Sequence, residues 1–476
     1  MSFARLAGIP LASMITALAL PAAGQAQQVP LAGLIGRVIQ ESTINGDSPG
    51  PNGTVIHHQG HFLVGEALEQ SARQMNVELG EQLLSFPLGS SSGGFSFTTN
   101  SMTGEVSPSS ETFGPAFAER AITIGKGQTN VGFAFRSTSF DSFEGVKLDS
   151  GGLSFIRQHN DCCPPTGPNS PSNNTDFNPA FERDLLQSNL SLDMTSRASV
   201  IFATYGVTDR FDVGVALPFV HVEIDAKVDG HILRLGSGSA TTHSFVNGTD
   251  RQTFTESGTS DGIGDVSLRA KYNFLRGDTT SMAGFLDLRL PTGDKDQLLG
   301  TGATQAEMLF IYSGDYGRVS PHVNIGYTLS HGESSELANA KQLDLDPDLT
   351  FPAVDLELPD QFNYTFGVNV AAAPRLTVGF DVNGRMLRDV ARFELRDNPY
   401  INRGAGTFPG TLPTFTATQE FSLQGERGNV NLVLGVIGAK INVAKTLLLN
   451  ANVLFPMSDA GLKPKPTLVV GLDYVF

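Results

Sequence analysis

From about residue 186 to the C-terminus, apolar and polar residues alternate with a period of two, in segments of about ten residues. The clearest segment, 265–274, places five apolar residues on one face and five polar residues on the other. Such alternation predicts β-strands with two different faces. Their length suits a tilted strand that crosses a bilayer. A soluble β-sandwich alternates in the same way, so the pattern alone leaves both architectures open.

The connections between these segments favour the membrane architecture. Short turns alternate with long connections rich in Gly, Ser and Asp, and an outer-membrane barrel has this arrangement of short turns on one side and long loops on the other. The short turns lie at 207–210, 275–279, 314–317, 373–375 and 444–445, and the long connections at 229–263, 331–360 and 390–428. Tyrosines collect next to the short turns and at the C-terminus, where an interfacial girdle is expected: Tyr205, Tyr272, Tyr312 and Tyr474.

The last strand carries the strongest single indication of a barrel. Every second residue from Leu468 to Phe476 is apolar, and the chain finishes on an aromatic residue. A fully apolar face up to a final Phe would promote aggregation in a soluble protein, but it suits contact with lipid. Tyr474 and Phe476 are therefore predicted to form the assembly signal read by the barrel-insertion machinery of the outer membrane.

The alternation predicts an all-β, antiparallel transmembrane barrel of about twelve strands, and an even number is usual for single-chain bacterial barrels. A split of the 390–428 connection would raise the count to fourteen. The expected strands lie near 127–139, 188–206, 211–227, 264–274, 281–290, 305–313, 318–330, 361–372, 375–388, 428–443, 446–456 and 465–476.

The N-terminal quarter of the chain follows a different pattern. Residues 1–26 combine Arg5, a short apolar run and small residues up to Ala26, which is typical of a secretory signal peptide. Residues 27–118 contain two stretches with the spacing of a helical face, one in 31–39 and one in 64–79. We expect 27–118 to be either a plug in the lumen or a periplasmic extension, and 119–476 to form the barrel.

Composition agrees with export to an outer membrane and narrows the possible partners. The net charge of −16 argues against nucleic acid, which selects basic surfaces. The two cysteines, Cys162 and Cys163, are adjacent and cannot form a loop-closing disulfide framework. After residue 26 no apolar stretch is long enough for a transmembrane helix. The expected partners are outer-membrane lipid and a small-molecule solute, and the sequence leaves the oligomeric state open.

Candidate chemical sites are weak. His57, His58 and His61 have a spacing that could bind a transition metal, but no Cys or carboxylate ligand accompanies them, so a solvated loop is favoured. The acidic stretch 344–360 lacks the glycine and the terminal glutamate of a calcium loop. No serine elbow or phosphate-binding loop is present. We therefore expect no catalytic site, no metal and no cofactor.

Charged residues on the polar faces of the strands are predicted to line the lumen, where they would either form a conduit or brace a packed interior. Asp212 and His221 differ in parity, so placing both inward requires a bulge, expected at Pro218. The predicted lumen-lining residues are Asp193, Arg197, Asp212, His221, Glu223, Arg269, Lys271, Asp287, Arg289, Asp381 and Arg385.

Two stretches carry a family resemblance: GIGDVSLRAKYNF at 262–274 and LRLPTGD at 288–294. They resemble outer-membrane barrels of the phenol-degradation meta-pathway family, which is grouped near the transporters of long-chain fatty acids and aromatic hydrocarbons. The resemblance implies passage of small, often hydrophobic molecules across the outer membrane, and it carries no binding residues over to this chain. Together with the barrel pattern and the charged inward faces, it predicts passive transport of small apolar or aromatic solutes. The alternatives are a general diffusion porin for hydrophilic solutes and a structural or adhesive barrel without transport.

Overall fold

The computed structural model describes residues 30–44, 110–115, 117–158, 184–235, 247–332, 358–402, 414–423, 427–444 and 446–476, with short pieces between 48 and 108 and at 243–245. The predicted signal peptide, the cysteine pair and the His57, His58 and His61 cluster lie outside these residues, as does nearly all of the acidic stretch 344–360. Within the described ranges, no helix is long and apolar enough to cross a membrane.

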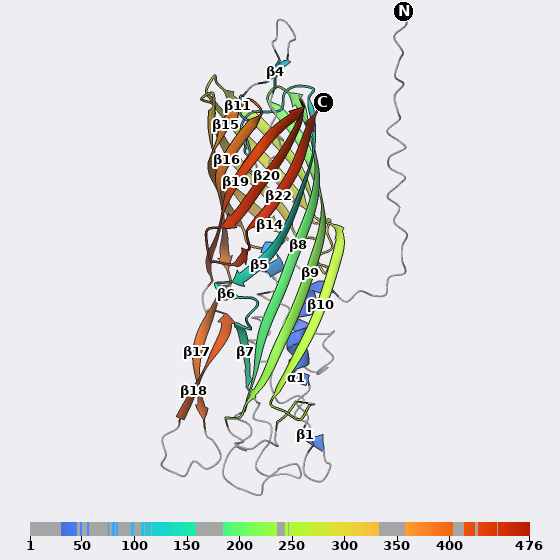
Figure 1. The fold of residues 1–476 in the computed structure, drawn as a ribbon, viewed down its shortest axis with the longest axis vertical. Helices are drawn as coiled ribbons and strands as arrows, with labels where there is room; N and C mark the ends of the chain where they lie inside the picture. The colour runs from blue at the N-terminus through green and yellow to red at the C-terminus, as the bar shows by residue number, and fades with distance from the viewer. Residues whose placement is uncertain are drawn as a thin grey trace, which may run out of the picture.

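In the described part of the chain, twelve antiparallel strands close into one barrel, in which each strand pairs with its neighbours in chain order (Figure 1). The last strand pairs with the first, and the N–H of Phe476 donates to Thr129 O at 2.9 Å. The strands are β5 (Thr129–Phe143), β8 (Leu185–Thr208), β9 (Phe211–Leu233), β11 (Val266–Arg276), β12 (Thr280–Leu290), β13 (Thr304–Gly314), β14 (Val319–His331), β15 (Gln361–Ala373), β16 (Leu376–Val390), β19 (Gly428–Ala444), β20 (Leu447–Pro456) and β22 (Thr467–Val475).

The predicted fold class and the count of twelve are confirmed, and the alternative of fourteen is wrong. The 390–428 connection does form two strands, β17 (Phe393–Asn402) and β18 (Thr414–Leu423), but these pair only with each other. The remaining elements are short or lie outside the barrel wall: η2 (Leu31–Gly33), α1 (Leu34–Ile44), β1 (Ser48–Pro49), β2 (Val55–Ile56), β3 (Phe97–Thr99), β4 (Val106–Pro108), β6 (Val146–Lys147), β7 (Leu153–Gln158), β10 (Arg251–Ile263) and β21 (Leu462–Pro464).

Two strands are about twice as long as a bilayer crossing requires. β8 has 24 residues and β9 has 23, whereas a tilted strand crosses the hydrocarbon with about 9–11. With β10 they form a blade that continues beyond the barrel at the end of the long connections, opposite the C-terminus (Figure 1).

The faces of the blade exchange their polarity along its length. Near the short turns the outward side chains are apolar, for example Ile201 and Tyr205 of β8. Farther along the same face they are polar, and the inner face becomes apolar and packs against α1. This exchange fits a strand that leaves lipid and enters water, because an exposed face has to match the solvent around it.

Helix α1 is held against the inner face of the blade. Its apolar residues, predicted from the 31–39 spacing, are buried together with side chains of β8 and β9. Arg37 Nε lies 2.6 Å from Glu256 Oε1 of β10, and Ser42 Oγ lies 2.9 Å from Ser188 Oγ of β8. The predicted helical stripe is thus confirmed, and it covers an apolar wall at the end of the barrel that carries the long connections.

Candidate functional site: a plugged lumen with an internal chamber

Of the eleven residues predicted to line the lumen, seven have side chains that point inward and four have side chains that point outward. Inward side chains alternate with exposed apolar ones along β11, β12 and β16, so the parity prediction holds on these strands, whereas on β9 it holds for Asp212 but not for His221 and Glu223. The inward residues are Asp212, Arg269, Lys271, Asp287, Arg289, Asp381 and Arg385. That they line a transport path stays a prediction.

Asp193, Arg197, His221 and Glu223 lie on the outer face, so their predicted inward placement is wrong. The ladder between β8 and β9 runs without a shift from Leu185↔Leu233 to Gly206↔Asp212, so the bulge expected at Pro218 does not occur. The physical reason is the exchange of polarity along the blade. These residues stand beyond the apolar band, where the outer face meets water, and Arg197 pairs with Glu223 at 3.9 Å there.

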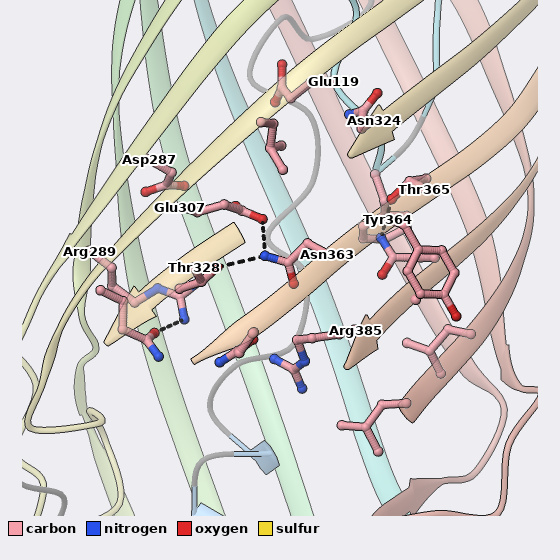
Figure 2. Close-up of a pocket in the computed structure, with 18 of the residues that line it drawn as sticks. Glu119, Asp287, Arg289, Glu307, Asn324, Thr328, Asn363, Tyr364, Thr365 and Arg385 are labelled. Atoms are coloured by element: carbon pink, nitrogen blue, oxygen red, sulfur yellow. Dashed lines mark hydrogen bonds between the residues drawn. The ribbon is translucent and has the colours of Figure 1, made fainter. Parts of the chain in front are cut away.

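Inside the barrel lies a chamber of about 170 Å³ whose wall is polar on one part and apolar on another. The polar part comes from β11 to β16, and Figure 2 shows Arg289, Glu307, Asn363 and Arg385 reaching into the interior. The apolar part gathers side chains from five elements and from the segment before β5: Phe117, Phe140, Phe285, Leu309, Leu432, Leu434, Leu462 and Pro464.

Some charged side chains in the chamber wall have an oppositely charged partner, and others hydrogen-bond to neutral side chains. Arg269 Nε lies 2.9 Å from Asp287 Oδ2, which forms an ion pair across β11 and β12. Arg289 Nη1 donates to a neutral group, Gln305 Oε1, at 3.1 Å. Asn363 Nδ2 donates to Glu307 Oε1 at 2.9 Å, as the dashed line in Figure 2 shows. The wall therefore combines the Arg269–Asp287 ion pair with two charged groups, Arg289 and Glu307, that hydrogen-bond to neutral side chains.

The segment before β5 crosses the lumen next to this chamber. We call residues 110–115 and 117–124 the plug. Its backbone and Thr112 bond to inward side chains of β9, β11, β13, β14 and β16, which lie around the barrel. The contacts are Thr112 Oγ1–Ser320 Oγ (2.8 Å), Phe113 N–Thr377 Oγ1 (3.1 Å), Ala121 N–Ser313 Oγ (2.9 Å), Asn273 Nδ2–Ala121 O (2.7 Å) and Ile124 N–Asp212 Oδ2 (3.0 Å).

Two buried lysines add charged contacts to the plug. Lys440 of β19 donates through Nζ to Pro115 O at 2.7 Å and to Phe113 O at 3.3 Å. Lys271 Nζ lies 3.5 Å from Glu119 Oε2 and 3.9 Å from Asp212 Oδ2. Hydrogen bonds to charged groups are stronger than neutral ones. The lysines are therefore the main individual anchors of the plug.

A second cavity, of about 350 Å³, lies on the other side of the plug toward the short turns. We call it the vestibule; its lining includes Arg120 and Ile122 of the plug and the turn residues Asp278 and Asp315. Glu119 faces the chamber, whereas its neighbour Arg120 faces the vestibule. The plug is therefore a thin partition that separates two cavities of one barrel.

The sequence predicted that the N-terminal segment, either a plug or a periplasmic extension, ends at 118, and it did not single out several residues of the site. The stretch 119–128 continues the lumen-crossing segment, and the first barrel strand begins only at Thr129. Glu307 and Lys440 lie on the inward parity of strands that were predicted, so alternation could have found them. Glu119 carried no local signal, because its contacts with the barrel are distant in sequence.

Residues of the two stretches that carry the family resemblance hydrogen-bond to the loop after β12 and hold it in place. Asp265 Oδ1 accepts from Gly293 N at 3.0 Å, and Asp265 Oδ2 accepts from the N–H and the hydroxyl of Thr301 at 2.7 and 2.8 Å. Thr292 Oγ1 donates to Gly264 O at 2.9 Å. These bonds, which we call the Asp265 clasp, tie the loop after β12 to the break between β10 and β11.

The clasped loop also contacts the N-terminal segment. It carries Leu298 and Leu299 into the apolar cluster that contains Leu31 of η2, and Ala32 N donates to Asp296 O at 3.0 Å. The motif thus positions backbone at the end of the barrel that carries the long connections, where η2 and α1 lie.

Comparisons with known proteins agree with this geometry. A family model described as "Putative MetA-pathway of phenol degradation" matches residues 169–385. The resemblance predicted from the sequence is confirmed. The match covers slightly less than half of the chain, from before β8 to Arg385 of β16. No curated protein matches.

Three solved structures illustrate the range of similar barrels. An outer membrane channel from Pseudomonas putida F1 is 11% identical over 75% of this chain and 98% of its own, with a TM-score of 0.43. A Pseudomonas aeruginosa FadL homologue is 10% identical over 73% and 89%, with a TM-score of 0.28. A porin is 8% identical over 73% and 100%, with a TM-score of 0.23. None of the three is described as an enzyme.

The closed barrel indicates in which cellular compartment the protein lies. Its outer surface carries a belt of exposed apolar side chains, including Phe310 of β13, Phe366 of β15 and Leu472 of β22. A closed β-barrel with an apolar exterior and a polar interior is the strand architecture that outer membranes accept. The protein is an outer-membrane β-barrel. Within the described residues, no group of three or more His, Cys, Asp or Glu side chains could hold a metal ion.

Proposed function

We propose that the protein is a plugged outer-membrane channel for the passive uptake of small apolar or aromatic solutes. The observation that carries this proposal is the apolar part of the chamber wall, where eight apolar side chains gather beside the polar part, next to the plug. Sites that bind small organic molecules combine apolar surface with polar groups that fix the orientation of the ligand. The family match, whose description refers to phenol degradation, agrees with aromatic solutes.

The alternative of a general diffusion pore for hydrophilic solutes has less support. Such a pore needs a continuous water-filled path lined by charges, whereas here the plug separates the chamber from the vestibule. The alternative of a structural barrel is favoured only by the buried contacts of the lumen, such as His322 Nε2 with Asp381 Oδ1 at 2.9 Å. Those contacts brace the wall and leave the chamber in place.

Proteoliposomes distinguish the three functions. We expect uptake of benzyl alcohol and other one-ring solutes above the rate of protein-free vesicles, without swelling in isosmotic sugars. Swelling in sugars would instead support the diffusion pore. An absence of any flux from a heat-modifiable, correctly inserted barrel would refute transport and support the structural alternative.

A further inference from the structure

The charges of the side chains that line the chamber cancel one another. Bringing a charged solute into a partly enclosed site is unfavourable unless an opposite charge pairs with it. A neutral solute therefore fits this wall better than an anion or a cation, and hydrogen bonds have to supply its recognition. Among the described residues, the charged lining consists of three cations and three anions: Arg269, Arg289, Arg385, Glu119, Asp287 and Glu307.

Two of these groups, Arg289 and Glu307, have opposite charges and are neighbours, but they do not form an ion pair. Glu307 is the register partner of Asp287 across β12 and β13, and Arg289 is two residues farther along β12. Arg289 and Glu307 are therefore diagonal neighbours on the inner face, a spacing that long side chains can bridge. Within the described residues, however, no cation nitrogen lies within 4.0 Å of a Glu307 oxygen. Figure 2 shows the two side chains on the same part of the wall.

Both groups have hydrogen-bonding capacity left. Glu307 accepts from Asn363 at Oε1, and within the described part of the chain its Oε2 accepts no hydrogen bond. Arg289 donates one hydrogen bond, through Nη1 to Gln305, although a guanidinium has five N–H donors. A hydroxyl can use both groups, because it donates one hydrogen bond and also accepts. A carboxylate would instead be repelled by Glu307, and an ammonium would be repelled by Arg289.

An apolar pair lies beside this polar pair on the same two strands. Phe285 and Leu309 are register partners, and Leu309 is two residues from Glu307 along β13. Two residues of a strand span about 6.7 Å, which is close to the length of one aromatic ring with a short hydroxyl-bearing arm. Phe117 of the plug lines the same cavity. A cavity of about 150 Å³ lined by apolar side chains takes up one benzene ring. The chamber, at about 170 Å³, therefore suits one ring and a small polar group.

We infer that Arg289 and Glu307 form a subsite for the hydroxyl of a neutral aromatic solute with one ring. The hydroxyl donates to Glu307 Oε2 and accepts from Arg289. The ring lies against Phe285, Leu309 and Phe117. The inference deepens the proposed function and rests on it, because it names the class of solute that the chamber selects.

Calorimetric titration of the full-length barrel in detergent tests the inference, with protein-free micelles as the blank. The probes are benzyl alcohol, benzyl methyl ether, toluene, benzoate and benzylamine, at about pH 8, where carboxylic acids are ionised and amines are protonated. Benzyl alcohol should bind at least tenfold more tightly than toluene, because it forms two hydrogen bonds to charged groups. The ether accepts but does not donate, so it should bind more weakly than the alcohol. Benzoate and benzylamine should also bind more weakly, since one of the two groups repels each of them.

Substitutions at the two positions should shift the preference in opposite directions. Glu307→Gln leaves Arg289 without its neighbouring anion, so benzoate should bind at least tenfold more tightly than it does to the parent. Arg289→Gln leaves Glu307 without its neighbouring cation, so benzylamine should gain in the same way. Both variants should weaken benzyl alcohol about fivefold, because one charged partner becomes a neutral one. If the two groups only braced the wall, neither substitution would change the order of the probes.

The matched controls are Arg197→Gln and Glu223→Gln, which make the same two changes to an ion pair on the outer face of the blade. They should leave all five affinities unchanged. Heat-modifiable migration of each variant confirms that the barrel is folded before its affinity is read. The inference is overturned if the parent binds benzyl alcohol no better than toluene or the ether, or if it prefers a charged probe. It is also overturned if either lumen variant keeps the parent's order of affinities.

Flux measurements separate failure of this inference from failure of the proposed function. Equal uptake of benzyl alcohol and toluene into proteoliposomes, above the rate of protein-free vesicles, would leave the channel standing and refute the hydroxyl preference. No such uptake of either solute would refute the channel, while calorimetry would still decide whether Arg289 and Glu307 bind a hydroxyl.

Discussion

Replacing Lys440 with methionine should loosen the plug and raise conductance through the barrel. Lys440 is buried on the inner face of β19, and its ammonium holds two plug carbonyls, those of Pro115 and Phe113. Methionine keeps the length of the side chain but donates no hydrogen bond, so both carbonyls lose a charged partner in a buried place. The matched variant is Thr377→Val, which removes one neutral bond, from Phe113 N at 3.1 Å.

The magnitudes of the two effects follow from the kinds of bond removed. Hydrogen bonds to charged groups contribute about 1.5–3 kcal/mol and neutral ones about 1 kcal/mol. Part of the lysine contribution is offset because burying its charge is itself unfavourable. A net loss of about 3 kcal/mol for Lys440→Met raises the population of a displaced plug by about two orders of magnitude, since each 1.4 kcal/mol is tenfold. For Thr377→Val the increase is about fivefold, from about 1 kcal/mol.

Single-channel recording in planar bilayers measures these populations as the fraction of time spent in a conducting state. The expected order is parent, then Thr377→Val, then Lys440→Met. The reasoning would be refuted if both variants inserted as heat-modifiable barrels and conducted like the parent. Equal increases for the two variants would show that the charge on Lys440 contributes nothing to holding the plug.

Three further predictions concern assembly, the clasp and export. Phe476→Ser should lower the yield of heat-modifiable barrel in the membrane, because Phe476 stacks edge-to-face on Tyr474 at 4.7 Å in the predicted assembly signal; an unchanged yield would contradict this. Asp265→Ala should destabilise the barrel by about 3 kcal/mol or more, because it removes three bonds to a buried carboxylate. Thermal unfolding measures that loss, and protease cutting within 293–303 should rise with it. The mature chain should begin at Gln27, and N-terminal sequencing of outer-membrane protein that found Met1 would refute the predicted signal peptide.

The barrel could be predicted from the sequence because each strand contains its own signal. The segment expected at 264–274 is β11 (Val266–Arg276), and the segment expected at 428–443 is β19 (Gly428–Ala444). Apolar and polar residues alternate with a period of two because one face of each strand contacts lipid and the other faces the lumen, and the short turns mark where each strand ends. Neither signal needs information from distant parts of the chain.

The plug and the chamber depend on contacts between residues that are far apart in sequence. Lys440 and Pro115 are separated by 325 positions, and Ile124 and Asp212 by 88. The plug forms no helix or strand, so periodicity gives no indication of where it lies. Its hydrogen bonds are made mostly by backbone groups, which every residue type carries. For this reason the sequence could leave a plug and a periplasmic extension open as alternatives, but it could not decide between them.

The outward placement of Asp193 and Arg197 was predictable in principle from the length of β8. Its odd-numbered positions are mostly polar up to Ser199 and mostly apolar from Ile201 onward, whereas its even-numbered positions up to Met194 are apolar except for Ser188. A strand of 24 residues cannot lie wholly within a bilayer, so one of its faces must change partner along the way. Where the alternation along a strand continues without a shift but the polar face becomes the apolar face, the strand crosses the membrane surface. A polar side chain within the membrane therefore points into the lumen, whereas one beyond the membrane surface points outward into water. On this criterion Arg289, on an 11-residue strand that does not extend beyond the barrel, keeps its inward assignment, and Arg197 does not.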